Sequence, residues 1–110
     1  RAVQIRIFNR QDDKELRSLI DDLDLDQRDN DLRNVESTYF GHNGIFLVAE
    51  EEGRILAYMG ARELAENQAE NILTVTRSAM RQSADSQLLD KLLAVVLNHA
   101  YQLDFAKVVR

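Results

Sequence analysis

The 110-residue chain contains no cysteine, which excludes thiol nucleophiles, disulfide frameworks and zinc–thiolate sites. It has only two histidines, His42 and His99, far apart and without a metal-ligand spacing, so no metal is expected. His42 falls in a Gly-His-Asn-Gly turn and is expected to be exposed. No repeat and no linker rich in proline, glycine or serine interrupts the chain, so residues 1–110 should form one domain, complete or part of a longer chain.

Long hydrophobic runs are also missing. No stretch approaches the ~18 apolar residues that suggest a membrane span, and no basic-then-apolar leader precedes Val3, so we expect a cytoplasmic protein without membrane contact. Nineteen acidic and fourteen basic residues give a net charge of −5, which argues against nucleic acid as a partner. Residues 77–110 carry five bases and three acids, so an anionic ligand should prefer this third of the chain.

Apolar residues near the start of the chain change from a period of two to a helical period. They alternate with polar residues over 3–7, which predicts a strand with one buried face. Asp12 and Glu15 have the spacing of a capping box, in which each side chain accepts a hydrogen bond from the other residue's backbone amide. The apolar spacing that follows predicts a helix over 12–23.

A second, shorter helix is predicted after the acidic run at 21–31. Asp29 or Asn30 could cap it, and Gly41 could end it in the left-handed conformation. The residues expected on its apolar face are Leu32, Val35, Tyr39 and Phe40.

The middle of the chain predicts an antiparallel hairpin, with strands at 45–49 and 54–60 around a turn at 50–53. Further along, β-branched residues at 72–76 predict another strand. A broad apolar stripe then indicates a helix at about 86–102.

A final strand is predicted at 105–109. Strand, long helix and strand form a right-handed crossover, so the last two strands should be parallel neighbours. We expect the final strand, residues 105–110, to recruit a neighbour, because a β-branched segment with unpaired amides tends to pair. That neighbour could be chain beyond Arg110, a second copy in a homodimer, or another protein.

Four segments, taken in order, carry a resemblance. They are an Ile-Arg-Ile strand before an acidic helix, residues 46–57 (FLVAEEEGRILA), the pair Ala69-Glu70 at the entry of the fourth strand, and residues 99–109 (HAYQLDFAKVV). They resemble the GCN5-related N-acetyltransferase (GNAT) family, whose hairpin reads FLVAEENGKIVG and whose helix exit reads FAKELGYKRIVL. The resemblance implies an α/β fold with a mixed sheet in the order β-α-α-β-β-β-α-β, truncated after the fifth strand.

In that family, exposed amides of the fourth strand bind the pantetheine arm of acetyl-coenzyme A, and a loop of the pattern Arg/Gln-x-x-Gly-x-Gly/Ala cradles its pyrophosphate. The resemblance implies the strand role for Val75 and Thr76. It implies the loop role for Arg81, Gln82, Ser83, Ala84 and Ser86. Ala84 and Ser86 stand where the pattern has glycines, and Asp85 adds a negative charge. We therefore expect coenzyme A binding to be weak or lost.

Two functions remain open. The missing glycines favour an interaction or regulatory module on a GNAT fold. The alternative is an active N-acetyltransferase that moves an acetyl group from acetyl-coenzyme A to a primary amine of a small molecule or protein. In that case the resemblance implies Glu70 as the general base, although a solvated carboxylate at the entry of a strand explains the same residue.

Other candidate residues also have two interpretations. Arg81 could hold a pyrophosphate or be a surface arginine near a helix start. Ser83 and Ser86 are expected to be helix caps rather than nucleophiles, and His99 a helix-end residue. The acidic run at 21–31 could attract a cationic amine, but we expect a solvated helix end.

Overall fold

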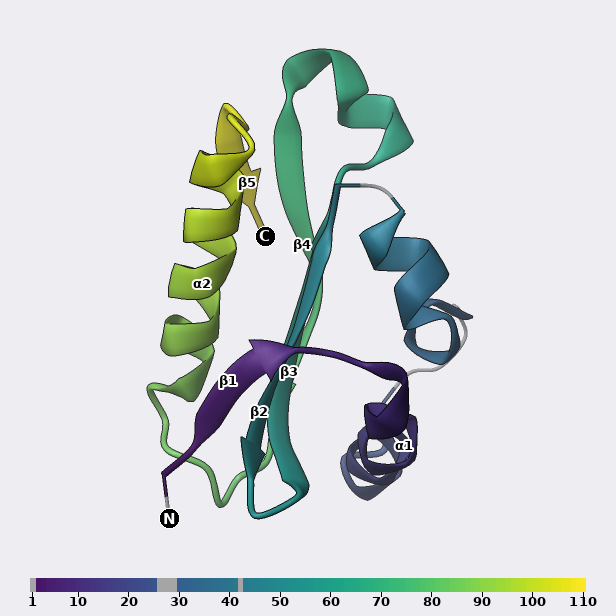
Figure 1. The fold of residues 1–110 in the computed structure, drawn as a ribbon, viewed down its shortest axis with the longest axis vertical. Helices are drawn as coiled ribbons and strands as arrows, with labels where there is room; N and C mark the ends of the chain where they lie inside the picture. Colours follow the sequence, from purple (N-terminus) through teal and green to yellow (C-terminus); the bar gives the residue numbers. More distant parts are fainter. Residues whose placement is uncertain (1, 26–29, 42) are drawn as a thin grey trace.

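The computed structural model describes residues 2–25, 30–41 and 43–110. A five-stranded sheet lies between helices on both faces (Figure 1). In spatial order the strands are β1 (Gln4–Ile7), β2 (Ile45–Glu51), β3 (Arg54–Arg62), β4 (Ile72–Met80) and β5 (Lys107–Val109). The helices are α1 (Asp13–Asp22) and α2 (Leu88–Gln102), with short helical turns η1 (Arg10–Asp12), η2 (Asn30–Arg33), η3 (Glu36–Phe40) and η4 (Ala65–Glu70).

The sheet is mixed, as predicted. Strands β1 to β4 pair antiparallel, whereas β4 and β5 run parallel with Leu73 opposite Val108. Helix α2 makes the crossover between these last two strands, which confirms the expected strand–helix–strand unit with parallel strands. No strand of the described chain pairs with the outer side of β5, so its recruitment of a neighbour stays a prediction.

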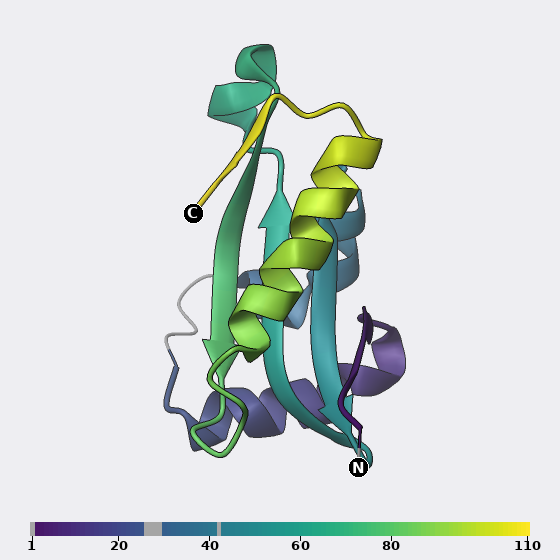
Figure 2. The same ribbon diagram turned by 90° about the vertical axis from the view of Figure 1, so that its left-hand side faces the viewer.

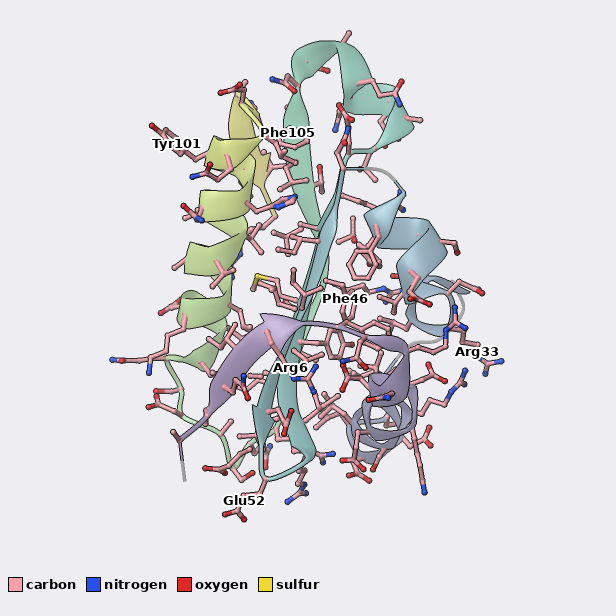
Figure 3. The ribbon with its side chains drawn as sticks, in the orientation of Figure 1. Arg6, Arg33, Phe46, Glu52, Tyr101 and Phe105 are labelled. Atoms are coloured by element: carbon pink, nitrogen blue, oxygen red, sulfur yellow. The ribbon has the colours of Figure 1, made fainter. Side chains whose placement is uncertain are left out.

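Each face of the sheet has its own apolar core. Helix α2 covers one face, and α1 covers the other together with η2 and η3 (Figures 1 and 2). The first core is centred on Leu47, Met59, Leu73, Leu92 and Val96. The second is centred on Leu16, Leu19, Tyr39, Phe46 and Tyr58. Figure 3 shows Phe46 between the sheet and η3, and Tyr101 pointing away from the sheet on α2. The sheet is therefore the central layer of three.

The predicted hairpin is confirmed, with strands slightly longer than expected. Glu52 and Gly53 form its two-residue turn, with φ of 52° and 81°. Two successive positive φ values match the twist of antiparallel strands, and glycine adopts the second without strain. Strand β4 is also longer than predicted, reaching Met80 rather than residue 76.

The start of the first helix differs from the prediction. Asp12 does not pair with Glu15; its Oδ2 accepts the backbone N–H of Asn9 at 2.8 Å, and the Asn9 Oδ1 accepts that of Gln11 at 2.9 Å. Arg6 also donates to both carboxylate oxygens of Asp12, each at 2.7 Å. Because these partners lie before the helix, Asp12 closes a cap one turn earlier and α1 begins at Asp13.

The second predicted helix is two short turns, η2 and η3, and three of its four expected apolar residues are buried. Phe40 is the exception, at 38% exposed. Gly41 is not left-handed, since its φ is −84°; Asn43 takes the left-handed conformation instead. The predicted caps, Asp29 and the side chain of Asn30, lie outside the described part of the chain.

The first strand also departs from its pattern. Ile5 packs against the α2 core, but Ile7 is 56% exposed. On the opposite face Arg6 is half-buried by its contacts with Asp12 and Glu50.

Among the helices of the described residues, none has the length and apolar character needed to cross a membrane.

Candidate functional site

A bulge interrupts β4 at Thr76. Gly60 of β3 lies opposite Arg77 and the next residue, Ala61, lies opposite Val75, so Thr76 has no partner across the β3–β4 ladder. A bulge can direct two successive side chains to one face of a sheet. Here Thr76 and Arg77 both reach toward η2 and η3, on the face that α1 covers.

These two side chains join a polar cluster, which we call the bulge cluster (Asp31, Tyr39, Thr76 and Arg77). Arg77 donates to both carboxylate oxygens of Asp31, from Nε at 2.7 Å and from Nη2 at 2.9 Å. The Tyr39 hydroxyl donates to Asp31 Oδ2 at 2.9 Å and lies 2.9 Å from Thr76 Oγ1. Because the single hydroxyl proton of Tyr39 goes to Asp31, Thr76 is the donor in the last contact.

Gly60 lets Tyr39 approach the sheet this closely. A Cβ atom on Gly60 would lie 2.7 Å from Phe46 Cδ2 and 2.8 Å from Tyr39 Cε1. Tyr39 and Phe46 also pack edge to face, with ring centroids 5.1 Å apart. The aromatic layer thus fixes the hydroxyl of Tyr39 against the bulge.

Burial and charge set the protonation states of the bulge cluster. Burial would raise the pKa of Asp31, but hydrogen bonds from Arg77 and Tyr39 outweigh it and hold that pKa below its ordinary value. Burial likewise raises the pKa of Tyr39 above its usual range, and raises that of Tyr58 nearby to about 12. At neutral pH the cluster therefore contains an ionised carboxylate and one protonated phenol, and the phenol of Tyr58 beside the cluster is protonated as well.

Beside the bulge, β4 has an open edge. Strand β5 pairs with β4 only at residues 72–74, and along Val75–Met80 no strand of the described chain pairs with that side. Figure 2 shows β5 meeting β4 near its first residues and then diverging from it. Because amides point alternately to the two sides of a strand, part of this segment presents unpaired donors and acceptors. Two predicted residues, Val75 and Thr76, lie where the strands part.

The predicted loop between β4 and α2 holds its arginine inward. Arg81 is 5% exposed, its Nε donates to the Ile55 carbonyl at 3.0 Å, and its Nη1 donates to Asp22 at 2.7 Å. Asp22 ends α1, so the guanidinium lies on the face of the sheet opposite α2. Arg81 is thus not the surface arginine considered from the sequence; it links β3, β4 and α1.

The other loop residues lie on the surface, and Asp85 organises them. Its Oδ1 accepts the backbone N–H of Gln87 at 2.8 Å, and its carbonyl accepts that of Leu88 at 2.9 Å. Ser83 and Ser86 are exposed. They are not the caps of α2, because Asp85 accepts the amide that precedes the helix. Gln82 is exposed and Ala84 half-buried, with the Ala84 N–H donating to the Arg81 carbonyl at 3.1 Å.

Glu70 does not join the other candidates. It is exposed at the end of η4, six residues before Thr76. Thr76 lies four residues after Ile72, the first residue of β4, so at ~3.3 Å per residue the bulge is roughly 13 Å along the strand from that end, and Glu70 lies before it in η4. Val75 and Thr76 therefore lie at the bulge, within β4. The loop residues follow the C-terminal end of this strand, and Glu70 lies just before its N-terminal end.

The remaining expectations have mixed outcomes. The acidic run is not simply solvated, since Asp22 and Asp31 pair with arginines; residues 26–29 and His42 lie outside the described part. His99, near the end of α2, contacts the Asn43 carbonyl through Nε2 at 3.0 Å. Within the described ranges, no three His, Cys, Asp or Glu side chains gather as a metal would require.

No model of a known protein family matches the sequence, and no curated protein matches it. Solved structures do match. A GNAT-family acetyltransferase from Staphylococcus aureus has a TM-score of 0.80 at 22% identity, covering 94% of this chain and 69% of its own. Glucosamine-6-phosphate N-acetyltransferase from Arabidopsis thaliana has a TM-score of 0.76 at 14% identity, covering 100% and 82%.

A third match is the N-acetylglutamate synthase from Neisseria gonorrhoeae, solved with coenzyme A and N-acetyl-glutamate. Its TM-score is 0.72 at 19% identity, and the match covers 98% of this chain and 24% of that one. At such identities the likeness concerns the fold. Over nearly its whole length, the chain has the fold of the GNAT acetyltransferases.

Proposed function

We propose that the chain is the donor-binding core of an N-acyltransferase, which moves an acyl group from a coenzyme A thioester to a primary amine. The observation that carries this proposal is the open edge of β4 along Val75–Met80, next to the bulge at Thr76. A pantetheine arm is extended and contains two amides, so it can pair with such an edge as an added strand does. The N-acetylglutamate synthase of the same fold, solved with coenzyme A, supports this choice of donor.

The reaction would be a direct transfer. The amine nitrogen attacks the thioester carbonyl carbon, a C–N bond forms, the C–S bond breaks, and the leaving thiolate takes up a proton. The amine must also lose protons. Asp31 is a poor base because its pKa is lowered, and Glu70, the base that the resemblance implies, lies in η4, outside the bulge cluster, so water is the simpler acceptor.

We infer a positioning role for the bulge cluster in this reaction. All four side chains have hydrogen-bond partners within the cluster, so they hold the bulge rather than react. A fixed bulge would keep the thioester carbonyl in one place at the end of the open edge.

A second candidate is an interaction or regulatory module on the same fold. It is favoured by the loop, where the carboxylate of Asp85 occupies the Gln87 amide and no glycine is present. This candidate predicts no transfer with any amine.

The test is amine-dependent release of thiol from acetyl-coenzyme A. Because the chain has no cysteine, a chromogenic disulfide reagent reports released thiol without background from the protein. Amino sugars, amino acids, polyamines and peptide N-termini serve as acceptors, and mass spectrometry identifies the acetylated product. Saturable release with an acetylated product supports the transferase. No release with any acceptor, together with no binding of coenzyme A, supports the module.

A further inference from the structure

We propose that this domain recognises its acyl donor through the pantetheine thioester alone, and that the nucleotide half of coenzyme A adds little to donor use. The inference rests on the proposed function and specifies its substrate class, which is acyl thioesters of pantetheine. It follows from a difference between the two ends of the strand–loop–helix unit formed by β4, residues 81–87 and α2. The edge of β4, where the thioester arm would bind, has unpaired backbone groups and is called the open end. The start of α2, where the diphosphate would bind, is called the closed end, because Asp85 already occupies an amide there.

The open end is the edge of β4. From Val75 to Met80 no strand in the described residues pairs with the side that faces away from β3. The bulge cluster fixes the backbone here through side chains on the α1 face, so it leaves the edge itself uncovered. Amide pairing along this edge needs only the pantetheine arm of the donor.

The closed end is the start of α2. An anion at a helix start is held by backbone N–H groups that the helix leaves without partners. Asp85 already supplies an anion there, since its Oδ1 accepts the Gln87 N–H at 2.8 Å. A diphosphate at the same place would have to displace that carboxylate and would meet its negative charge.

The two arginines nearest the loop do not compensate. Residues 77–110 carry a net positive charge, but Arg77 and Arg81 are engaged by Asp31 and Asp22. Arg81 is also buried and directed to the face opposite α2. The two arginines nearest the loop in sequence therefore stabilise the fold instead of presenting a guanidinium to a phosphate.

Two glycine positions complete the closed end. A glycine lets the backbone curl close around a phosphate, and a side chain restricts this approach. The positions that carry glycine in the pattern are occupied by Ala84 and Ser86. The Ala84 amide is also used, because it donates to the Arg81 carbonyl at 3.1 Å.

The experiment compares S-acetyl-pantetheine with acetyl-coenzyme A as donors, in the wild-type chain and in Asp85→Ser. A serine hydroxyl can also accept the backbone N–H two residues on, so the variant should keep the turn before α2. Asp85→Asn is the second variant, which removes the charge but keeps an oxygen that accepts the Gln87 amide. Asp21→Asn is the control for net charge, since Asp21 is exposed on α1. Kinetics of thiol release and calorimetric binding of both donors are the measurements.

We expect kcat/KM for the two donors to agree within about threefold in the wild type, whereas a working diphosphate cradle with charge-assisted hydrogen bonds would favour coenzyme A by roughly a hundredfold. Asp85→Ser should raise kcat/KM for acetyl-coenzyme A about fivefold and leave the pantetheine donor unchanged. A wild-type preference of a hundredfold for acetyl-coenzyme A, or variants that leave the donor ratio unchanged, overturns this inference while the transferase stands. No transfer and no binding with either donor overturns both.

Discussion

Arg77 and Asp31, 46 positions apart in the sequence, form a bidentate ion pair with N–O distances of 2.7 and 2.9 Å. The pair joins the bulge of β4 to η2 on the face that α1 covers. Both side chains are mostly buried, at 20% and 11% exposed. The pair therefore stabilises the fold and also holds the bulge of β4, which is part of the candidate site.

Arg77→Leu should destabilise the protein strongly. The substitution leaves the carboxylate of Asp31 buried without its cation, which costs about 3 kcal/mol and lowers the melting temperature by roughly 10 °C or more. Thermal and urea unfolding measure both quantities. The matched control is Arg10→Leu, because Arg10 pairs with Glu36 on the surface, where the loss should be about 0.5 kcal/mol or less. Equal losses in the two variants would contradict a structural role for the buried pair.

Tyr39→Phe should cost about 1–2 kcal/mol. The ring stays, but Asp31 loses a donor and Thr76 loses its acceptor, and both groups are part-buried. Urea unfolding measures the difference. Tyr101→Phe is the control, since Tyr101 is 78% exposed and its hydroxyl faces water. A Tyr39→Phe protein as stable as the wild type would show that the hydroxyl contacts do not hold the bulge.

Acid should unfold the protein through its paired carboxylates. Hydrogen bonds from Arg6 lower the pKa of Asp12 against the effect of burial, and those from Arg77 and Tyr39 lower that of Asp31 despite its burial. A folded-state pKa below the ordinary 3.8 stabilises the native state above that pH, and the contribution is lost as pH falls through the lower folded value. Urea unfolding from pH 7 to pH 3 should show stability falling below about pH 4. Asp31→Asn should weaken that fall, and an unchanged pH profile in this variant would argue against the ion pair.

Gly60→Ala should destabilise the aromatic layer by about 1–3 kcal/mol, because the added Cβ meets Phe46 and Tyr39 at 2.7 and 2.8 Å. Gly41→Ala is the matched control. Its φ is ordinary and the nearest atom to an added Cβ is the Ser37 carbonyl oxygen at 3.3 Å, so the cost should be below about 1 kcal/mol. A larger cost at Gly41 than at Gly60 would contradict the described positions of Tyr39 and Phe46.

Local patterns in the sequence were enough to predict the hairpin and the parallel crossover. The Glu52-Gly53 turn and the apolar stripe of α2 depend on neighbouring residues, and the structure confirms both. The sequence predicts the capping box one turn too late, because the spacing of Asp12 allows a partner on either side. Asp12 also accepts a hydrogen bond from Arg6 in addition to the one from the Asn9 amide, and the sequence spacing does not predict this contact.

The site was harder to predict, because its contacts join distant parts of the chain. Thr76 was expected only as a strand amide, and Arg77 had no assigned role. The extra residue of the bulge moves both side chains to one face of the sheet. A sequence pattern that assumes strict alternation of inward and outward residues does not predict such a bulge. Arg81 was expected on the surface or at a phosphate, since no local pattern shows that a side chain turns inward to a residue 59 positions away.

The central claim is that the open edge of β4 binds the donor while the loop before α2 contributes little. Amide chemical-shift mapping by NMR tests this most directly, with coenzyme A and pantetheine titrated in turn into the isotopically labelled chain. We predict that both ligands shift the amides of Val75–Met80 and change those of residues 82–87 only slightly. Shifts centred on residues 82–87 with coenzyme A, or saturating concentrations that leave Val75–Met80 unchanged, would contradict the account.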